Sequence, residues 1–318
     1  MTIAQPDRTL AATGLILAYA AIVGLADNYV RAVAGELGLW QVHLSRSVLA
    51  LMMLFAAAPF LGLRMRPKRW GGVVARSALH GVAIMIYFGA LGFLPVAIVA
   101  AGLFTAPIFV LLISRLVYGH RIGPFRILAV GLGFLGVILV LGPSALAGAT
   151  LAAGLPVLAG ALYGLGNIAT RQWCEGETAE CLLAGFFVSL GVLGLIGLAV
   201  MTALHLEVPP GSAGFILRGF VWPSGYTNWV LLGMALGSLV GVGLSIRAYQ
   251  LTDAGRASVL EYMILPSSAF WTWIVWDEAL DLTAWAGMAL IAGAGLLIAL
   301  RAKMSEDSGS ETRSNQLA

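Results

Sequence analysis

The chain alternates long apolar stretches with short polar ones, and the apolar stretches are long enough to cross a membrane. A membrane-spanning helix needs about 20 mostly apolar residues. Ten stretches meet this requirement: 11–34, 40–61, 71–93, 96–117, 124–142, 152–172, 181–204, 228–250, 257–276 and 283–301. The pattern therefore predicts an all-α membrane protein with ten transmembrane helices.

Two polar segments interrupt or end this pattern. The connection 205–226 contains Pro and Gly, which argue against a further span. Its aromatic residues suggest a loop lying at the membrane interface: Phe215, Phe220, Trp222 and Tyr226. The polar end of the chain, 302–318, is predicted to be a disordered cytoplasmic tail.

Two octapeptides, 140 positions apart, share an unusual pattern. GLADNYVR (24–31) and GLGNIATR (164–171) agree in Gly, Leu and Arg, and Asp27 falls opposite Asn167. Further on, 90–107 aligns with 248–266. Each half holds five helices, an odd number, so the second half enters the membrane inverted. The sequence predicts two inverted five-helix repeats, 1–145 and 146–301, an arrangement common in secondary transporters.

The repeated octapeptide allows two interpretations. Asp27 and Arg31 lie four residues apart on one helix face and can pair, and small residues such as Gly24 permit close helix approach. The element is then a gate or packing node, with Arg171 as the counterpart of Arg31. Alternatively, both copies seal helix ends near the interface, where Arg reaches the headgroups at little cost.

Composition agrees with a membrane location and charge indicates the orientation. Hydrophobic residues make up 60% of the chain and charged residues 10%, against roughly 25% charged in soluble proteins. Most basic residues lie in alternate connections, which places both termini in the cytoplasm and the chain in the inner membrane. Nucleic acid is therefore not an expected partner. Cys174 and Cys181 are too few for a disulfide framework and are expected to be reduced thiols.

Two segments of the chain resemble the EamA-type branch of the drug/metabolite transporter superfamily. They are YFGALGFLPVAIVAAGLFTAPIFVLLISRLVYGHRI and IRAYQLTDAGRASVLEYMILPSSAFWTWIVWDEALD, one in each half. His120 stands where this family usually has Glu, and Asp277 where it usually has Gly. The resemblance covers nearly the whole chain. The resemblance implies small-metabolite transport. Within the superfamily, the chain resembles amino-acid exporters more than nucleotide-sugar carriers.

His80 lies near the middle of the third predicted span. Ser77, His80, Ile84 and Tyr87 share one helical face, and ionisable residues inside a membrane usually face a bundle interior or a wet cavity. This face is predicted to line a substrate path. The alternative is a core histidine that bonds a backbone carbonyl.

Glu261 precedes Pro266 in the ninth predicted span, and Thr105 precedes Pro107 at the matching place in the fourth. Pro removes a donor and leaves a carbonyl free, and such local breaks often mark transport sites. Glu261 binds an ammonium group or forms a structural ion pair with Arg247 or Arg256. The ion pair is the preferred interpretation.

These features predict a transporter that exports small metabolites, most plausibly amino acids with aromatic or other apolar side chains, by alternating access without required ion coupling. Proton-coupled drug or metabolite efflux is the alternative. An alternative from a different functional class is an intramembrane enzyme, but no catalytic motif is recognised. No cofactor or metal is expected. The protein is expected to work as a monomer. The expected cavity residues are His80, Tyr87, Phe104, Thr105, Tyr163, Asn167, Ser245 and Tyr262, with Asn28 near the outer mouth. The expected gating or ion-pair residues are Asp27, Arg31, Arg171 and Glu261.

Overall fold

The structure, a computed structural model, describes residues 8–142 and 151–317. All regular secondary structure in these ranges is helical. The first half contains α1 (Thr9–Asn28), α2 (Val30–Ala34), α3 (Leu39–Leu61), α4 (Trp70–Ala90), α5 (Val96–Leu103), α6 (Ala106–Leu116) and α7 (Pro124–Leu141). The second half contains η2 (Leu151–Ala153), α8 (Gly154–Gln172), α9 (Ala179–Leu204), η3 (Gly211–Gly214), α10 (Gly225–Leu251), α11 (Ala254–Leu260), η4 (Glu261–Met263), α12 (Ile264–Trp276) and α13 (Leu282–Leu317).

The ten expected spans are all present, although some of them are broken into shorter helices. In the described part of the chain, nine helical segments are long and apolar enough to cross a membrane. The remaining expected span, the ninth (257–276), consists of α11, η4 and α12 in succession. The prediction of an all-α membrane protein with ten transmembrane segments is therefore confirmed.

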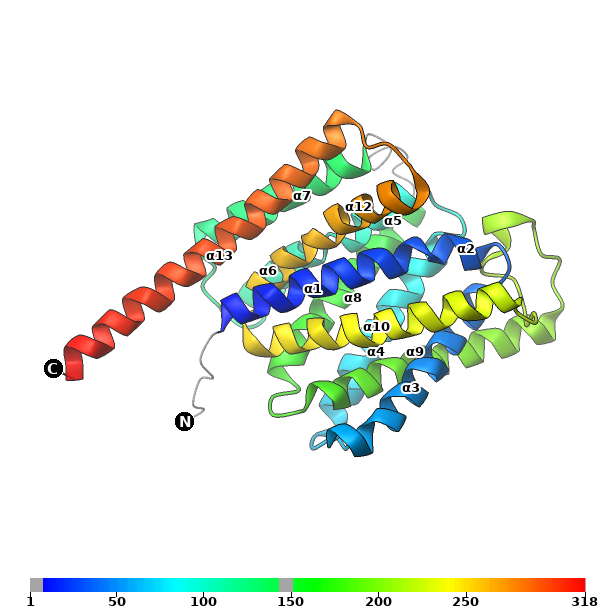
Figure 1. The fold of residues 1–318 in the computed structure, drawn as a ribbon, viewed down its shortest axis with the longest axis horizontal. Coiled ribbons are helices and arrows are strands. Elements are labelled where there is room, and N and C mark those ends of the chain that lie inside the picture. The colour runs from blue at the N-terminus through cyan, green and yellow to red at the C-terminus, as the bar shows by residue number, and fades with distance from the viewer. Residues whose placement is uncertain (1–7, 143–150, 318) are drawn as a thin grey trace.

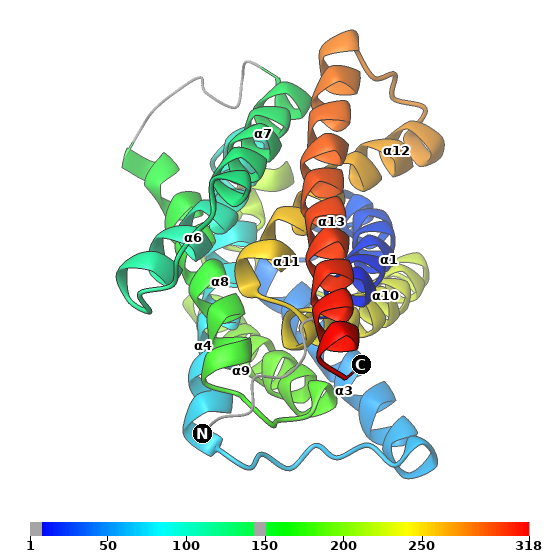
Figure 2. The same cartoon turned by 90° about the vertical axis from the view of Figure 1, so that its left-hand side faces the viewer.

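The helices form a bundle with two distinguishable ends. In Figure 1, α1 runs from the end where the chain begins to the opposite end, where α2 lies. We call the first the proximal end and the second the distal end. Figure 2 shows α7 and α13 side by side, and both helices contact α11.

Helix pairing follows the same scheme in both halves. α1 packs against α10 and α12, and α8, at the matching place, packs against α4 and against α5 and α6. The second helices, α3 and α9, pair with each other, as do the last helices, α7 and α13. This is the pairing that two inverted repeats would give. The predicted repeat boundary at 145/146 lies outside the described residues.

The glycines of the repeated octapeptide lie at two equivalent helix crossings. A Cβ on Gly24 would lie 2.6 Å from Ser267 Oγ and 2.9 Å from the backbone nitrogen of Ser268. A Cβ on Gly164 would lie 2.9 Å from the carbonyl oxygen of Ala106. Thus α1 crosses the start of α12 closely, and α8 crosses the start of α6 in the same way. The octapeptide is a packing node used once in each half.

The connection 205–224 covers the distal end of the bundle and contains no further span. Phe220, Trp222 and Tyr226 are exposed, as expected for interfacial residues, but Phe215 is buried. The reason is that this loop is tied to the bundle: the backbone N–H of Leu39 donates to the carbonyl of Phe215 (2.7 Å). Arg218 also donates to the carbonyl oxygens of Ala34 and Leu37, each at 2.9 Å.

The chain after Arg301 differs from the predicted disordered tail, since α13 continues as a helix to Leu317. Its apolar part, Leu282–Arg301, is long enough to span the membrane. A formed helix propagates at lower cost than it nucleates, so a polar sequence can extend it.

Candidate functional site

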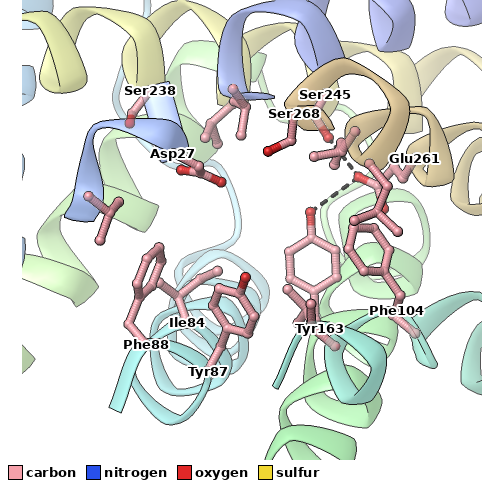
Figure 3. Close-up of a pocket in the computed structure, with 18 of the residues that line it drawn as sticks. Asp27, Ile84, Tyr87, Phe88, Phe104, Tyr163, Ser238, Ser245, Glu261 and Ser268 are labelled. Atoms are coloured by element: carbon pink, nitrogen blue, oxygen red, sulfur yellow. Dashed lines mark hydrogen bonds between the residues drawn. The ribbon is translucent and has the colours of Figure 1, made fainter. Parts of the chain in front are cut away.

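A cavity of about 660 Å³ occupies the centre of the bundle and extends to the distal end. Both halves contribute to its walls, which include α1, α4, α8, α10 and the η4 turn (Figure 3). Ten of the residues singled out from the sequence line it: Asp27, Asn28, Arg31, His80, Tyr87, Phe104, Tyr163, Asn167, Ser245 and Glu261.

Two broken spans meet at this cavity. The helix break between α5 and α6 falls at Phe104 and Thr105, just before Pro107. The break between α11 and α12 is the turn Glu261–Met263, just before Pro266. The expected break before each proline is thus present, and each places one side chain on the cavity wall, Phe104 and Glu261.

Glu261 is buried and receives four hydrogen bonds from neutral groups. Tyr163 and Ser245 donate to Oε1 at 3.1 and 3.2 Å. Tyr249 and Asn167 donate to Oε2 at 2.8 and 3.3 Å. The preferred ion pair with Arg247 or Arg256 is not formed, because Glu261 faces the cavity while Arg247 bonds Gln250. The negative charge of this carboxylate is therefore stabilised only by the dipoles of neutral donors.

His80 is also buried, and it connects to the same network. Its Nε2 lies 3.0 Å from Asn167 Oδ1, and its Nδ1 lies 3.1 Å from the carbonyl oxygen of Arg76. The ring packs edge-on to Tyr163, with centroids 5.1 Å apart. His80 therefore lines the cavity and also approaches a backbone carbonyl. Asn167 bridges His80 and Glu261.

The remaining wall is largely apolar. Figure 3 shows Ile84, Tyr87 and Phe88 on one side of the open space and Phe104 and Tyr163 on another. Asp27 points into the space from α1, beside Ser238 of α10. An aromatic lining with few polar groups is typical of sites that bind small organic molecules.

The distal mouth contains the ion pair that Arg31 makes. Arg31 binds Glu278 at 2.7 Å and lies over the ring of Trp276, 3.9 Å from its centroid. Arg31 therefore does not pair with Asp27, as the helix spacing had suggested, because α1 is interrupted at Tyr29 and Arg31 belongs to α2. Asn28 bonds Ser268 and accepts from Thr272, which joins α1 to α12.

The proximal end is closed by contacts between the two halves. Arg126 pairs with Asp253 at 2.9 Å. Trp173 donates to the Tyr118 hydroxyl at 2.9 Å, and the backbone nitrogen of Lys68 donates to Glu177 at 2.8 Å. The cavity residues do not reach this layer. The conformation is thus open toward the distal end and closed toward the proximal end.

Three expected site residues lie away from the cavity. Thr105 bonds the carbonyl of Gly102 at 2.6 Å, which stabilises the break between α5 and α6. Tyr262 is fully buried against α7, where a Cβ on Gly133 would lie 2.4 Å from its ring. Arg171 lines a separate proximal pocket with His120 and Asp253. Tyr262 faces away because η4 turns adjacent side chains in different directions.

The cavity residues that were not foreseen include Tyr19, Arg46, Arg76 and Tyr249. Arg46 and Arg76 are ionisable residues inside spans, so the argument used for His80 applies to them equally. The tyrosines carry no comparable signal, because aromatic residues are common in packed bundles. In the described residues, no group of three or more His, Cys, Asp and Glu side chains is placed to hold a metal.

Comparison with known proteins finds relatives that are named transporters or exporters. A model of the EamA-like transporter family matches residues 10–142. A riboflavin transporter of Brucella anthropi is 27% identical over 82% of this chain and 86% of its own length. The pseudopaline exporter CntI of Pseudomonas aeruginosa is 22% identical over 88% and 93% of the two chains. A solved crystal structure, at 18% identity, has the same fold, with a TM-score of 0.70 over 93% of this chain and 98% of that one. Residues 10–142 thus match the EamA-like transporter family, and the chain is similar over most of its length to proteins named as transporters or exporters.

Proposed function

We propose that this protein exports small organic metabolites, amino acids with aromatic or other apolar side chains in particular, across the inner membrane by alternating access. The observation that carries the proposal is the cavity, which is closed at the proximal end, open at the distal end and lined by both halves. Its volume of about 660 Å³ falls within the usual range for sites that bind small molecules. A monomer encloses the whole cavity and is the proposed functional unit.

The proposed orientation places the proximal end in the cytoplasm. The basic residues of the connection 62–69 and of the segments around 121–126 and 247–256 belong to that end. Short connections rich in Lys and Arg stay on the cytoplasmic side. The conformation described above would then be the outward-open one, and the Arg126–Asp253 pair would belong to the inner gate.

The test is flux into and out of proteoliposomes containing the purified protein. Vesicles are loaded with labelled Trp, Phe, Thr, riboflavin or a nucleotide sugar, first without any ion gradient. Saturable amino-acid flux is expected, and should be absent from vesicles without protein. Lack of flux for every amino acid in both directions would contradict the proposed substrates.

Riboflavin is the second candidate substrate. Two observations favour it: relatives are named riboflavin transporters, and the cavity is wide and aromatic enough for a planar ring system. In the same experiment, flux of riboflavin without flux of amino acids would select this candidate.

Proton coupling is tested in the same vesicles. The carboxylate of Glu261 has only neutral hydrogen-bond partners, so a proton or a cationic group could neutralise it. If transport is uncoupled, an imposed pH gradient leaves substrate accumulation at equilibrium unchanged. Accumulation that follows the gradient would establish the coupled alternative and direct attention to Glu261, His80 and Asp27.

The orientation can be tested with introduced cysteines, because the native thiols are expected not to react with a maleimide. Cys174, in the connection between α8 and α9, is 1% exposed, and burial raises its pKa to about 11. At pH 8 only about one thiol in a thousand would then be the reactive thiolate. We expect a maleimide to leave both cysteines of the folded protein unlabelled and to label them after denaturation in SDS. Rapid labelling of the folded protein would contradict this packing.

A single cysteine at Arg66 then reports the proximal end. In intact cells a membrane-impermeant maleimide should fail to label Arg66→Cys unless the membrane is first permeabilised. A cysteine at Glu207, in the distal connection, should be labelled in intact cells. The opposite result would invert the proposed orientation.

A further inference from the structure

Arg46, on α3, is a buried arginine whose Nε has no hydrogen-bond partner in the described part of the chain. Only 6% of the residue is exposed, and it lines the central cavity. Arg76, the other intramembrane arginine at the cavity, uses its guanidinium on Thr170 and on the carbonyl of Leu182. Burial of a cation is costly when its N–H donors have no partner, unless a ligand binds it.

Asp27 provides the opposite charge nearby. Its carboxylate points into the cavity from α1 (Figure 3). Arg46 lines the same cavity as Asp27, and the two groups form no ion pair among the described residues. No hydrogen bond to either side chain is found in the described part of the chain. The cavity therefore contains a separated positive and negative charge, each with unused hydrogen-bonding capacity.

The neighbours of this pair do not satisfy it. His43, one turn before Arg46 on α3, packs edge-on to Phe88 with centroids 5.0 Å apart, and neither of its ring nitrogens has a partner. Ser47 Oγ is also unpartnered. Ser238 lies on the far side of Asp27 in Figure 3. These groups are uncharged or weakly basic, so a ligand that brings both charges meets no competing internal partner.

We propose that Asp27 and Arg46 together bind the head group of a zwitterion, with Arg46 on the carboxylate and Asp27 on the ammonium group. A guanidinium can hold a carboxylate through two parallel hydrogen bonds. An α-amino acid carries both charges on one carbon, so it can reach both walls at once. Its side chain then faces Ile84, Tyr87 and Phe88, which lie next to this part of the cavity. The substrate class is an α-amino acid with an apolar or aromatic side chain.

This inference rests on the proposed transport function, and Glu261 is a separate site in it. Glu261 already receives four hydrogen bonds from the protein. In the described part of the chain Asp27 accepts no hydrogen bond and Arg46 donates none, so the head group is assigned to them.

The first test uses the unmodified protein and needs no variant. Tryptophan, tryptamine and indole-3-propionate share one ring system but carry both charges, only the cation or only the anion. Binding is measured by ligand-induced thermal stabilisation of the detergent-solubilised protein. We expect tryptophan to bind about tenfold or more tightly than either analogue, because each analogue leaves one buried charge unpaired. Equal binding of all three, or no binding of tryptophan, would overturn the proposal.

The second test assigns each charge. Asp27→Asn should weaken tryptophan binding about tenfold and leave indole-3-propionate unchanged. Arg46→Gln should weaken tryptophan binding similarly and leave tryptamine unchanged, and Arg46→Lys should recover part of the loss. The exposed residues Arg66 and Glu207 provide matched controls as Arg66→Gln and Glu207→Gln. If both site variants weaken all three ligands equally, the assignment is wrong.

These experiments can overturn the proposed head-group site and the proposed transport function independently. Zwitterion-selective binding without any flux would keep the head-group site and remove the transport proposal. Flux of riboflavin without amino-acid binding would keep a transport function and overturn the head-group site.

Discussion

Glu261→Ala is expected to abolish transport and to lower the stability of the protein by roughly 2–3 kcal/mol, at about 0.6 kcal/mol for each of the four lost hydrogen bonds in a membrane interior. The carboxylate is the common acceptor for groups on α8 and α10. Without it, the η4 turn loses its links to both helices. Transport is measured as flux in proteoliposomes, and stability as the midpoint of thermal unfolding in detergent.

Glu261→Gln separates the two effects. The glutamine keeps the volume and one acceptor oxygen, and the hydroxyls of Tyr163, Ser245 and Tyr249 can rotate to accept from its amide. We expect most of the stability to return while transport stays impaired if the charge itself is required. An alanine variant with normal flux and an unchanged unfolding midpoint would refute the central role of this network.

Gly136→Val and Gly287→Val are each expected to destabilise the protein by roughly 3 kcal/mol, the upper range for overpacking a well-packed core. These two glycines lie where α7 and α13 touch backbone to backbone. A Cβ on Gly136 would lie 2.7 Å from the carbonyl oxygen of Gly287, and one on Gly287 would lie 2.6 Å from that of Gly136. Since neither backbone can rotate away as a side chain can, the two helices would have to separate. The readout is the unfolding midpoint and the fraction of monodisperse protein on size exclusion.

Matched controls exist on the same two helices. Gly131 on α7 and Gly293 on α13 have nothing within 4 Å of a built Cβ. Gly131→Val and Gly293→Val add the same side chain to the same helices at open positions and should leave both readouts unchanged. If all four variants behave alike, loss of glycine flexibility rather than the close contact is responsible.

The helices could be predicted well because a membrane imposes length and apolarity on every span. The discontinuity of the ninth span could be placed from Pro266, and that of the fourth from Pro107. The position of Phe215 could not be predicted, because the same aromatic side chain suits the interface and the interior. Only the tertiary contact of its loop with Leu39 decides between them.

The cavity was predicted in outline and missed in detail. His80 and Tyr163 could be assigned from helix faces and depth, since regular helices keep a fixed side-chain period. Tyr262 lies against α7 and does not line the cavity, whereas its neighbour Glu261 in the η4 turn faces the cavity. The Arg31 partner was wrong because its helix is interrupted at Tyr29. The position of Arg46 at the cavity could have been predicted without tertiary information, because the argument for ionisable residues inside spans applies to it as it does to His80.

The two halves share a scaffold, but their equivalent positions present different chemistry to the cavity. Asp27 stands where the second half has Asn167, and Glu261 has no acidic counterpart beside Phe104. Exchange of the outward-open and inward-open forms would therefore join two states with unequal substrate affinity. For an uncoupled carrier, the half-saturation concentrations at the two faces would differ while the ratio of maximal rate to half-saturation stays equal in both directions. The protein would then have different transport kinetics in the two directions without being a pump. Its asymmetric lining would set how quickly transport responds to substrate on either side, and the concentration gradient would set the direction of net transport.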